Sequence, residues 1–391
     1  MARRERRKQD PLSQSLDKAR RMLELSPLVC IYQKVEEVVS TLQQDLQRGF
    51  AGQDAADWLS GHIERMLDLL PQSFGERFYF DASMIGALSE EWGGGSTRLS
   101  GMIVPKPSQD WGHMSLPLAT YDRTATHVID LVLLPGEDRL EDVDLLAYPF
   151  LSHELGHNAL FKYDKVFPQS FWLVLEQVTN GLLRQSLADK GAARSLARDT
   201  VTLIRQLWSP TANHYNWAHE IAMDVIALWT TGPAYLATFH DILEDEELNP
   251  YLVGQSHPPY EIRANALIDA SNRLGWENHT QSLTDRVAHW RQSHWWEERN
   301  NRYVACASPD LVRGCVTSVI AACETLSLPR CTGETLKGIQ EKLNCGETPD
   351  FGSEVLIAAW MQWQHMDKDS FSAWESSVVR ELAQAVMPEI R

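Results

Sequence analysis

The chain has 391 residues, of which 36 are Lys or Arg and 53 are Asp or Glu, so its formal charge is −17. This acidic balance argues against nucleic acid as the main partner, because phosphate binding requires a clustered positive surface. Apolar residues make up 43% of the sequence, which is enough for a sizeable core, and the length predicts one large domain with added helices or two domains.

The one dense basic run, residues 2–8, is at the N-terminus and is expected to be a solvated tail. No apolar stretch follows it, so it does not have the form of a secretory signal. No run approaches the ~18–20 apolar residues that cross a bilayer. We therefore expect a cytoplasmic protein that does not insert into a membrane.

Residues 11–71 carry apolar side chains at helical spacing and are expected to form helices that end near Pro71. Short β-like runs follow at 78–80, 102–104 and 127–134, separated by the glycines at 93–95 and by several prolines. From Asp142 the pattern is helical almost to the end. The expected helical segments are 142–162, 170–187, 191–208, 214–231, 258–273, 280–299 and 352–388. The sequence thus predicts a predominantly helical α+β fold, with a small sheet against many helices.

Cysteine and tryptophan cluster in the C-terminal third. Five of the six cysteines lie between Cys306 and Cys345, too widely spaced for a usual structural zinc site. Without a secretory signal, disulfides are not expected, and these cysteines are interpreted as small buried side chains on helices. The tryptophans at 276, 290, 295 and 296 are expected to pack in a core or between domains rather than to bind a ligand.

The strongest chemical signal is the segment from Ser152 to His157, which reads His-Glu-x-x-His from His153. On a helix, positions i and i+4 share a face, so the imidazoles of His153 and His157 can bind one Zn²⁺ ion. Glu154 lies beside them, where a carboxylate can take a proton from the attacking water and deliver it to a leaving amine. The alternative is a pair of hydrogen-bonded core histidines. The apolar side chains around the motif predict an interior helix, where buried histidines need partners.

A catalytic zinc site requires a third protein ligand. Glu220 and Asp224 are again i and i+4, on an apolar segment that ends at Gly232. Because carboxylates on such a helix are costly without a compensating charge, we expect Glu220 to bind the metal and Asp224 to orient a ligand histidine. His219 is the competing ligand, but it points about 100° away from Glu220 around the helix.

A third segment, Ser256 to Arg263, contains His257 directly before two prolines that suit the start of a helix. His257 could therefore enter a cleft from a loop. By itself the segment is more typical of an ordinary helix entry than of a functional site.

Together, the three segments resemble the gluzincin family that contains the CAAX prenyl proteases and the heat-shock membrane metalloproteases. That family has a His-Glu-x-x-His helix, then Glu-x-x-x-Asp, then His-Pro with an Arg six residues after the His. The matching positions are His153/Glu154/His157, Glu220/Asp224, and His257/Pro258/Arg263, within residues 125–270. The resemblance implies that His153, His157 and Glu220 bind zinc, that Glu154 is the general base, and that Asp224 hydrogen-bonds a ligand histidine. It also implies that His257 and Arg263 stabilise the transition state or organise the cleft.

These expectations give a zincin-like catalytic domain at 76–270, between an N-terminal helical region at 1–75 and a C-terminal helical region at 271–391. The expected function is zinc-dependent hydrolysis of a cytoplasmic protein or peptide, with the flanking regions available to a regulatory partner. The strand at 127–134 could be the sheet edge that binds substrate as an added strand, or a plain core strand. Two alternatives remain. The chain could be a catalytically silent binding module with the zincin fold. Zinc could also only hold helices together, with His219 or His257 as its fourth protein ligand.

Overall fold

The computed structural model describes residues 10–71, 74–92, 102–109, 111–119, 125–137, 139–162, 167–186, 192–209, 216–244, 249–253, 257–299 and 301–386. The basic run at 2–8 and the glycines at 93–95 lie outside these residues. The chain forms two compact units. Unit 1 comprises Met1–Ile85, Ser100–Val143 and Ala383–Arg391, and unit 2 comprises Gly86–Leu99 and Asp144–Leu382.

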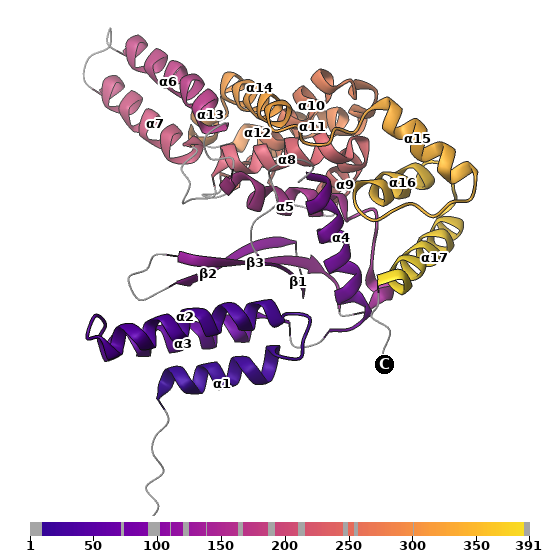
Figure 1. Cartoon of the computed structure of the whole chain (residues 1–391). Coiled ribbons are helices and arrows are strands. Elements are labelled where there is room, and N and C mark those ends of the chain that lie inside the picture. The colour runs from indigo at the N-terminus through magenta and orange to yellow at the C-terminus, as the bar shows by residue number, and fades with distance from the viewer. Residues whose placement is uncertain are drawn as a thin grey trace, which may run out of the picture. The chain divides into compact units, whose positions relative to one another are not determined.

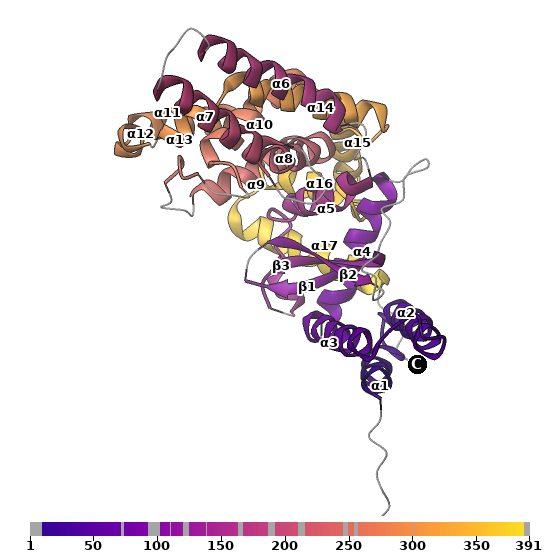
Figure 2. The same cartoon turned by 90° about the vertical axis from the view of Figure 1, so that its left-hand side faces the viewer.

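The main elements of unit 1 are three helices, the sheet and the first part of α4 (Glu76–Trp92) (Figures 1 and 2). The helices are α1 (Pro11–Leu23), α2 (Val29–Gln47) and α3 (Gln53–Leu69), as expected for residues 11–71. Their apolar faces share one core with the sheet, in which α2 and α3 contact the strands and α1 packs on both helices. Leu12, Ile31 and Ile63 from the helices and Leu131 from the sheet are fully buried in this core.

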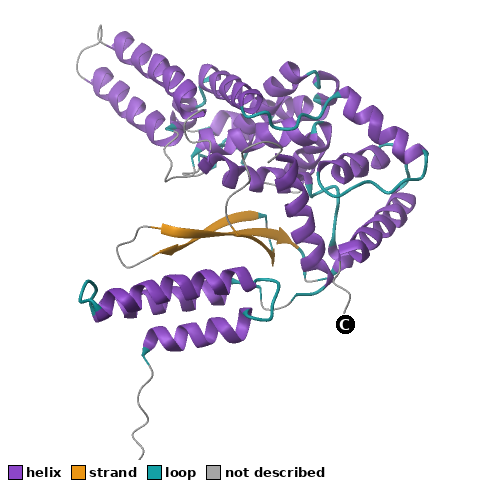
Figure 3. Cartoon of the chain, in the orientation of Figure 1, coloured by secondary structure: helices purple, strands orange, loops and turns teal. Residues whose placement is uncertain are grey.

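The sheet, whose strands are orange in Figure 3, has three strands in the order β1-β3-β2. They are β1 (Met102–Ser108), β2 (Gly112–Ala119) and β3 (Ala125–Pro135), with β1 parallel and β2 antiparallel to β3. The runs at 102–104 and 127–134 therefore form the expected strands, whereas β2 was not predicted. Pro105, Pro107 and Pro117, interpreted as breaks, lie inside β1 and β2. Each of these strands has one unpaired side in the described sheet, where a missing N–H group costs no ladder hydrogen bond.

The interpretation of 127–134 as a substrate-binding edge is wrong. β3 is the central strand and pairs on both sides, so its backbone groups have no free edge to offer a peptide. Its residues Ile129 to Val132 and Leu134 are buried, as the alternative of a core strand predicted.

The aromatic run at 78–80 is also not a strand. It lies in α4 (Glu76–Trp92), where Phe78 and Phe80 are buried. A buried ion pair between Arg77 and Asp81, 3.0 Å from Nε to Oδ2, joins positions i and i+4 of this helix. Arg77 also donates to the carbonyl of Pro135, so the first turns of α4 are fixed to the end of β3.

Unit 2 is helical throughout its described part. Its elements are α5 (Pro149–Lys162), α6 (Phe167–Ser186), α7 (Ala192–Trp208), α8 (Trp217–Thr231), α9 (Pro233–Glu244), α10 (Tyr260–Leu274), η2 (Glu277–His279), α11 (Gln281–Gln292), α12 (His294–Glu298), α13 (Asn301–Cys306), α14 (Pro309–Thr325), α15 (Gly333–Asn344), α16 (Ser353–Trp363) and most of α17 (Lys368–Val386). The expected helical segments all correspond to helices. Within the described residues, no helix is both long and apolar enough to cross a membrane.

Helix α8 is the centre of unit 2, and α5, α9, α10, α14 and α16 pack around it. Every residue of α8 except His219 is buried, which explains its apolar sequence on all sides. The side chain of Asn216 caps its first turn by accepting from the backbone N–H groups of Ala218 and His219. At its other end Gly232 adopts φ +58°, a conformation that ends the helix before Pro233.

The chain passes from one unit to the other after residues 85, 99, 143 and 382, whereas the expected domains have boundaries after 75 and 270. Two packing contacts account for the difference. Helices α1–α3 share a core with the sheet, and α14 of the C-terminal region packs against α8 and α10, with Cys315 Sγ 3.5 Å from the Ala218 carbonyl oxygen. Regions that share a core in this way fold as one unit.

Cys306, Cys315, Cys323 and Cys331 are buried, as predicted, but Cys345 is exposed where the chain leaves α15. Burial raises the pKa of the Cys331 thiol to about 12, so this thiol stays protonated and inert. Of the four clustered tryptophans, Trp276 and Trp290 are buried, while Trp295 and Trp296 are partly exposed.

Candidate metal centre

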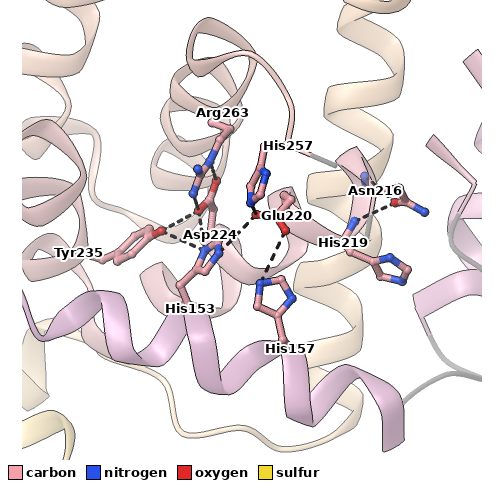
Figure 4. Close-up of polar contacts among 10 residues, drawn as sticks. His153, His157, Asn216, His219, Glu220, Asp224, Tyr235, His257 and Arg263 are labelled. Atoms are coloured by element: carbon pink, nitrogen blue, oxygen red, sulfur yellow. Dashed lines mark hydrogen bonds and ion pairs between the residues drawn. The ribbon is translucent and has the colours of Figure 1, made fainter. Parts of the chain in front are cut away.

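The site is formed where α5 and α8 lie side by side. Gly156 makes this approach possible, because a Cβ atom at that position would lie 2.6 Å from the Met223 sulfur on α8. Helix α5 contributes His153 and His157 from one face, and α8 contributes Glu220 from the facing side (Figure 4). The two sequence segments, more than sixty residues apart, therefore meet in space.

The ligand atoms of His153, His157 and Glu220 all lie within 4.8 Å of one another, and all three residues are buried. His153 Nε2 is 3.5 Å from Glu220 Oε2, and His157 Nε2 is 3.6 Å from Glu220 Oε1. Two imidazoles and one carboxylate are a donor set that Zn²⁺ accepts, as do other transition metals. This group could hold a metal ion.

The hydrogen bonds of His153 indicate which of its nitrogens faces the group. Its Nδ1 lies 2.9 Å from Oδ1 of the buried Asp224 carboxylate, which can only accept, so Nδ1 carries the proton. When the ring is neutral, its Nε2 then presents a lone pair toward Glu220. Glu220 Oε2 is buried and makes no hydrogen bond in the described part of the chain. Lone pairs that face one another in a buried site are costly unless a proton or a metal ion lies between them, so the residues present fit a metal ion.

The ionisation behaviour of the same side chains agrees with this geometry. Burial acts to lower the pKa of His153, but the hydrogen bond to Asp224 and the nearby carboxylates of Glu220 and Glu154 outweigh it and raise the pKa to about 9. Burial acts to raise the pKa of Glu220, but the adjacent imidazoles of His157 and His153 lower it to about 2. Both shifts favour positive charge between the imidazole nitrogens and the carboxylate.

Asp224 is the centre of a buried network behind His153 (Figure 4). Arg263, from α10, donates from Nε to Oδ2 at 2.8 Å and from Nη2 to Oδ1 at 2.7 Å. The Tyr235 hydroxyl, from α9, donates to Oδ1 at 2.6 Å. Burial would raise the pKa of Asp224, but the charge and hydrogen bonds of Arg263 hold it well below its ordinary value. Asp224 therefore stays ionised and fixes the orientation of the His153 ring.

Arg263 is itself buried, and its guanidinium lies 5.1 Å from the ring centroid of Phe239. Its hydrogen bonds run to Asp224 rather than toward the metal-ligand group. Of the two roles considered for Arg263, this arrangement favours organising the cleft over direct contact with a substrate.

Glu154 and His257 flank the ligand group. Glu154 is buried on α5 beside His153, and its charge contributes to raising the pKa of that histidine. His257 comes from the loop before α10, as expected, and its Nε2 lies 3.6 Å from Glu220 Oε2. The His257 side chain is 66% exposed, so the site reaches solvent on this side.

His219, the competing ligand, is not part of the group of ligand atoms found among the described residues. Figure 4 shows its ring on a different side of α8 from Glu220, as the helical angle predicted.

Tyr235 is the one residue of the network that the sequence analysis missed. It is fully buried on α9, a helix that was not among the expected segments. Its hydroxyl lies 2.6 Å from Asp224 Oδ1 and 3.3 Å from His153 Nδ1. A tyrosine two residues after Pro233 carries no local signal for this role, because the contact depends on how α9 folds back against α5 and α8.

Comparison of the chain with protein families, curated proteins and solved structures found no match.

Proposed function

We propose that this protein is a zinc-dependent endopeptidase that hydrolyses peptide bonds of a cytoplasmic protein or peptide. The observation that carries the proposal is the buried group of His153, His157 and Glu220, with Glu154 next to it on the same helix. Three protein ligands are typical of catalytic zinc, whereas structural zinc sites usually have four. Among the described residues, neither His219 nor His257 joins this group of metal-ligand candidates as a fourth ligand. This favours a catalytic zinc site over a purely structural one.

Each side chain has a chemical role that its position supports. His153 and His157 would hold the ion through Nε2, and Glu220 through its carboxylate. Zn²⁺, when bound, supplies a Lewis acid that polarises a carbonyl group and increases the acidity of water.

Glu154 would accept the proton of the attacking water and transfer it to the leaving amine. His257, the exposed member of the site, would donate a hydrogen bond to the developing oxyanion. The Asp224 network would keep Nδ1 of His153 protonated and the ring in position.

The sequence resemblance to the gluzincin family supports the same proposal. Its three motifs correspond, in order and spacing, to three segments of this chain. Residues from these three segments lie close together in the fold (Figure 4). The zincin-like core remains part of the proposal, and so does control of the activity by a regulatory partner. The substrate would have to bind elsewhere than along β3, because that strand has no free edge.

The decisive experiment compares wild type with Glu154→Gln, using Glu176→Gln on α6 as an exposed control on the same unit. Metal content is measured by elemental analysis, and cleavage is measured on a broad peptide library by mass spectrometry. We expect all three proteins to bind about one zinc per chain. Glu154→Gln should lose about a hundredfold or more of the cleavage rate, the effect of a missing general base.

Full cleavage by zinc-loaded Glu154→Gln would overturn the assigned role of Glu154. A zinc-loaded wild type that cleaves no library peptide and creates no new termini in a cell lysate would instead indicate the catalytically silent binding module.

A further inference from the structure

A cavity lies in unit 2, between α10, α11, α12, α13 and α14, with a volume of about 440 Å³. This volume is in the range of cavities that hold small molecules. Part of its wall is α10, which also carries Arg263 of the metal centre. The cavity contains Trp296, one of the clustered tryptophans that the metal centre does not use.

The charged side chains of the cavity are three arginines and two carboxylates. Both carboxylates are already neutralised. The buried Glu261 accepts from Arg291 Nη2 at 3.0 Å and also from the Tyr303 hydroxyl. Asp269 accepts from Arg273 Nε at 3.0 Å. Arg291 is therefore paired with Glu261, and two further guanidinium groups line the cavity.

These two groups are Arg299 and Arg313. The Arg299 guanidinium is held flat over the Trp296 ring, with its carbon 3.6 Å from the ring centroid, and donates to the Trp296 carbonyl. Arg299 has no carboxylate partner in the described part of the chain. Arg313 has only Asp310 at 3.5 Å, an exposed pair that contributes little. Both arginines line the same cavity, and a guanidinium group suits a carboxylate, which it can bind through paired hydrogen bonds.

The remaining wall is largely apolar and includes Ile262, Val304, Pro309 and Val312. A ligand that fits both parts needs an apolar body next to its anionic group. A dianion is disfavoured, because Asp310 already partly compensates the charge of Arg313, so the two guanidinium groups suit a single negative charge. On a chain with a formal charge of −17, an excess of arginine in one cavity is a local feature that attracts a single negative charge.

We propose that this cavity binds an amphipathic monocarboxylate, with the carboxylate on Arg299 and Arg313 and the apolar group against Trp296 and the aliphatic wall. The same chemistry is found in a small organic acid and in the C-terminal residue of a peptide chain. The proposal does not depend on the peptidase function, since it concerns different side chains and is tested by binding alone.

The test is isothermal titration calorimetry of the full chain with N-acetyl-leucine, N-acetyl-phenylalanine and N-acetyl-tryptophan. Each acid is compared with its neutral amide, which has the same shape without the charge. We expect one acid per chain to bind at least tenfold more tightly than its amide. The double variant Arg299→Gln/Arg313→Gln should lose at least tenfold in affinity, while Arg380→Gln, an exposed control on α17, should not change it.

A second arm distinguishes the two sources of the carboxylate. A hexapeptide ending in the preferred residue is titrated with a free and with an amidated C-terminus. Binding of the free hexapeptide indicates a chain end as ligand, and binding of the N-acetyl amino acids alone indicates a small acid. Equal affinity for acids and amides, no binding of any probe, or unchanged affinity in the double arginine variant would overturn the proposal.

Discussion

Replacing Asp224 with Asn tests the buried network behind the metal centre. Asn has nearly the same shape but no charge, and its amide can offer either an oxygen or an NH₂ group to His153. In the native protein the Asp224 carboxylate accepts two hydrogen bonds from Arg263, one from Tyr235 and one from His153. The substitution therefore affects both the stability of unit 2 and the binding of metal.

The two effects have separate magnitudes. Arg263 is buried, so loss of its counter-charge leaves an unpaired buried cation, which typically costs about 3–5 kcal/mol of folding free energy. Loss of the charged acceptor behind a ligand histidine typically weakens metal binding by about ten- to a hundredfold. This weakening corresponds to about 1.4–2.7 kcal/mol of binding free energy.

Stability is measured by urea unfolding with excess chelator, so that metal binding does not contribute. Zinc affinity is measured separately by competition with a chromophoric chelator. The double variant Asp224→Asn/Arg263→Met removes both charges and should recover at least half of the lost stability, without recovering zinc affinity. A stability loss below about 1 kcal/mol in Asp224→Asn, together with zinc affinity within twofold of wild type, would falsify this account of the network.

Three further predictions concern other residues of unit 2. Tyr235→Phe removes the hydroxyl that donates to Asp224 at 2.6 Å and should cost about 1.5–3 kcal/mol in urea unfolding; an unchanged midpoint would contradict this. Gly156→Ala places a methyl group 2.6 Å from a sulfur atom on α8 and should lower both Tm and zinc affinity, whereas Gly181→Ala, with open space in α6, should raise stability by about 0.5–1 kcal/mol. Burial raises the pKa of Glu375 to about 7, so the folded state binds its proton more tightly than the unfolded state, and the resulting stability is lost as pH rises from about 4.5 through 7. Urea unfolding at pH 5 and pH 8 should show a smaller loss of stability for Glu375→Gln than for wild type, and equal losses would refute this assignment.

Much of the fold could be predicted because its signals are local. Helical spacing of apolar residues correctly placed the helices of residues 11–71 and most of those from α5 onward, although α9, α13, α14 and α15 were not among the expected segments. The errors lie where local signals conflict. The aromatic run at Phe78 suggested a strand, but its buried residues belong to a helix whose Arg77–Asp81 pair has helical spacing. β2 was missed because Pro117 suggested a break, although an edge strand accepts a proline.

The metal-ligand candidates were likewise accessible from the sequence alone. Two side chains four residues apart on a helix share a face whatever surrounds the helix, so the pairs His153/His157 and Glu220/Asp224 followed from spacing. Only tertiary packing decided how the pairs combine. Asp224 reaches His153, and Tyr235 joins them from α9, because α5, α8 and α9 pack together around the close approach at Gly156. The spacing within each helix is set by backbone geometry, whereas contacts between helices depend on side chains distant in the sequence, and no local pattern records them.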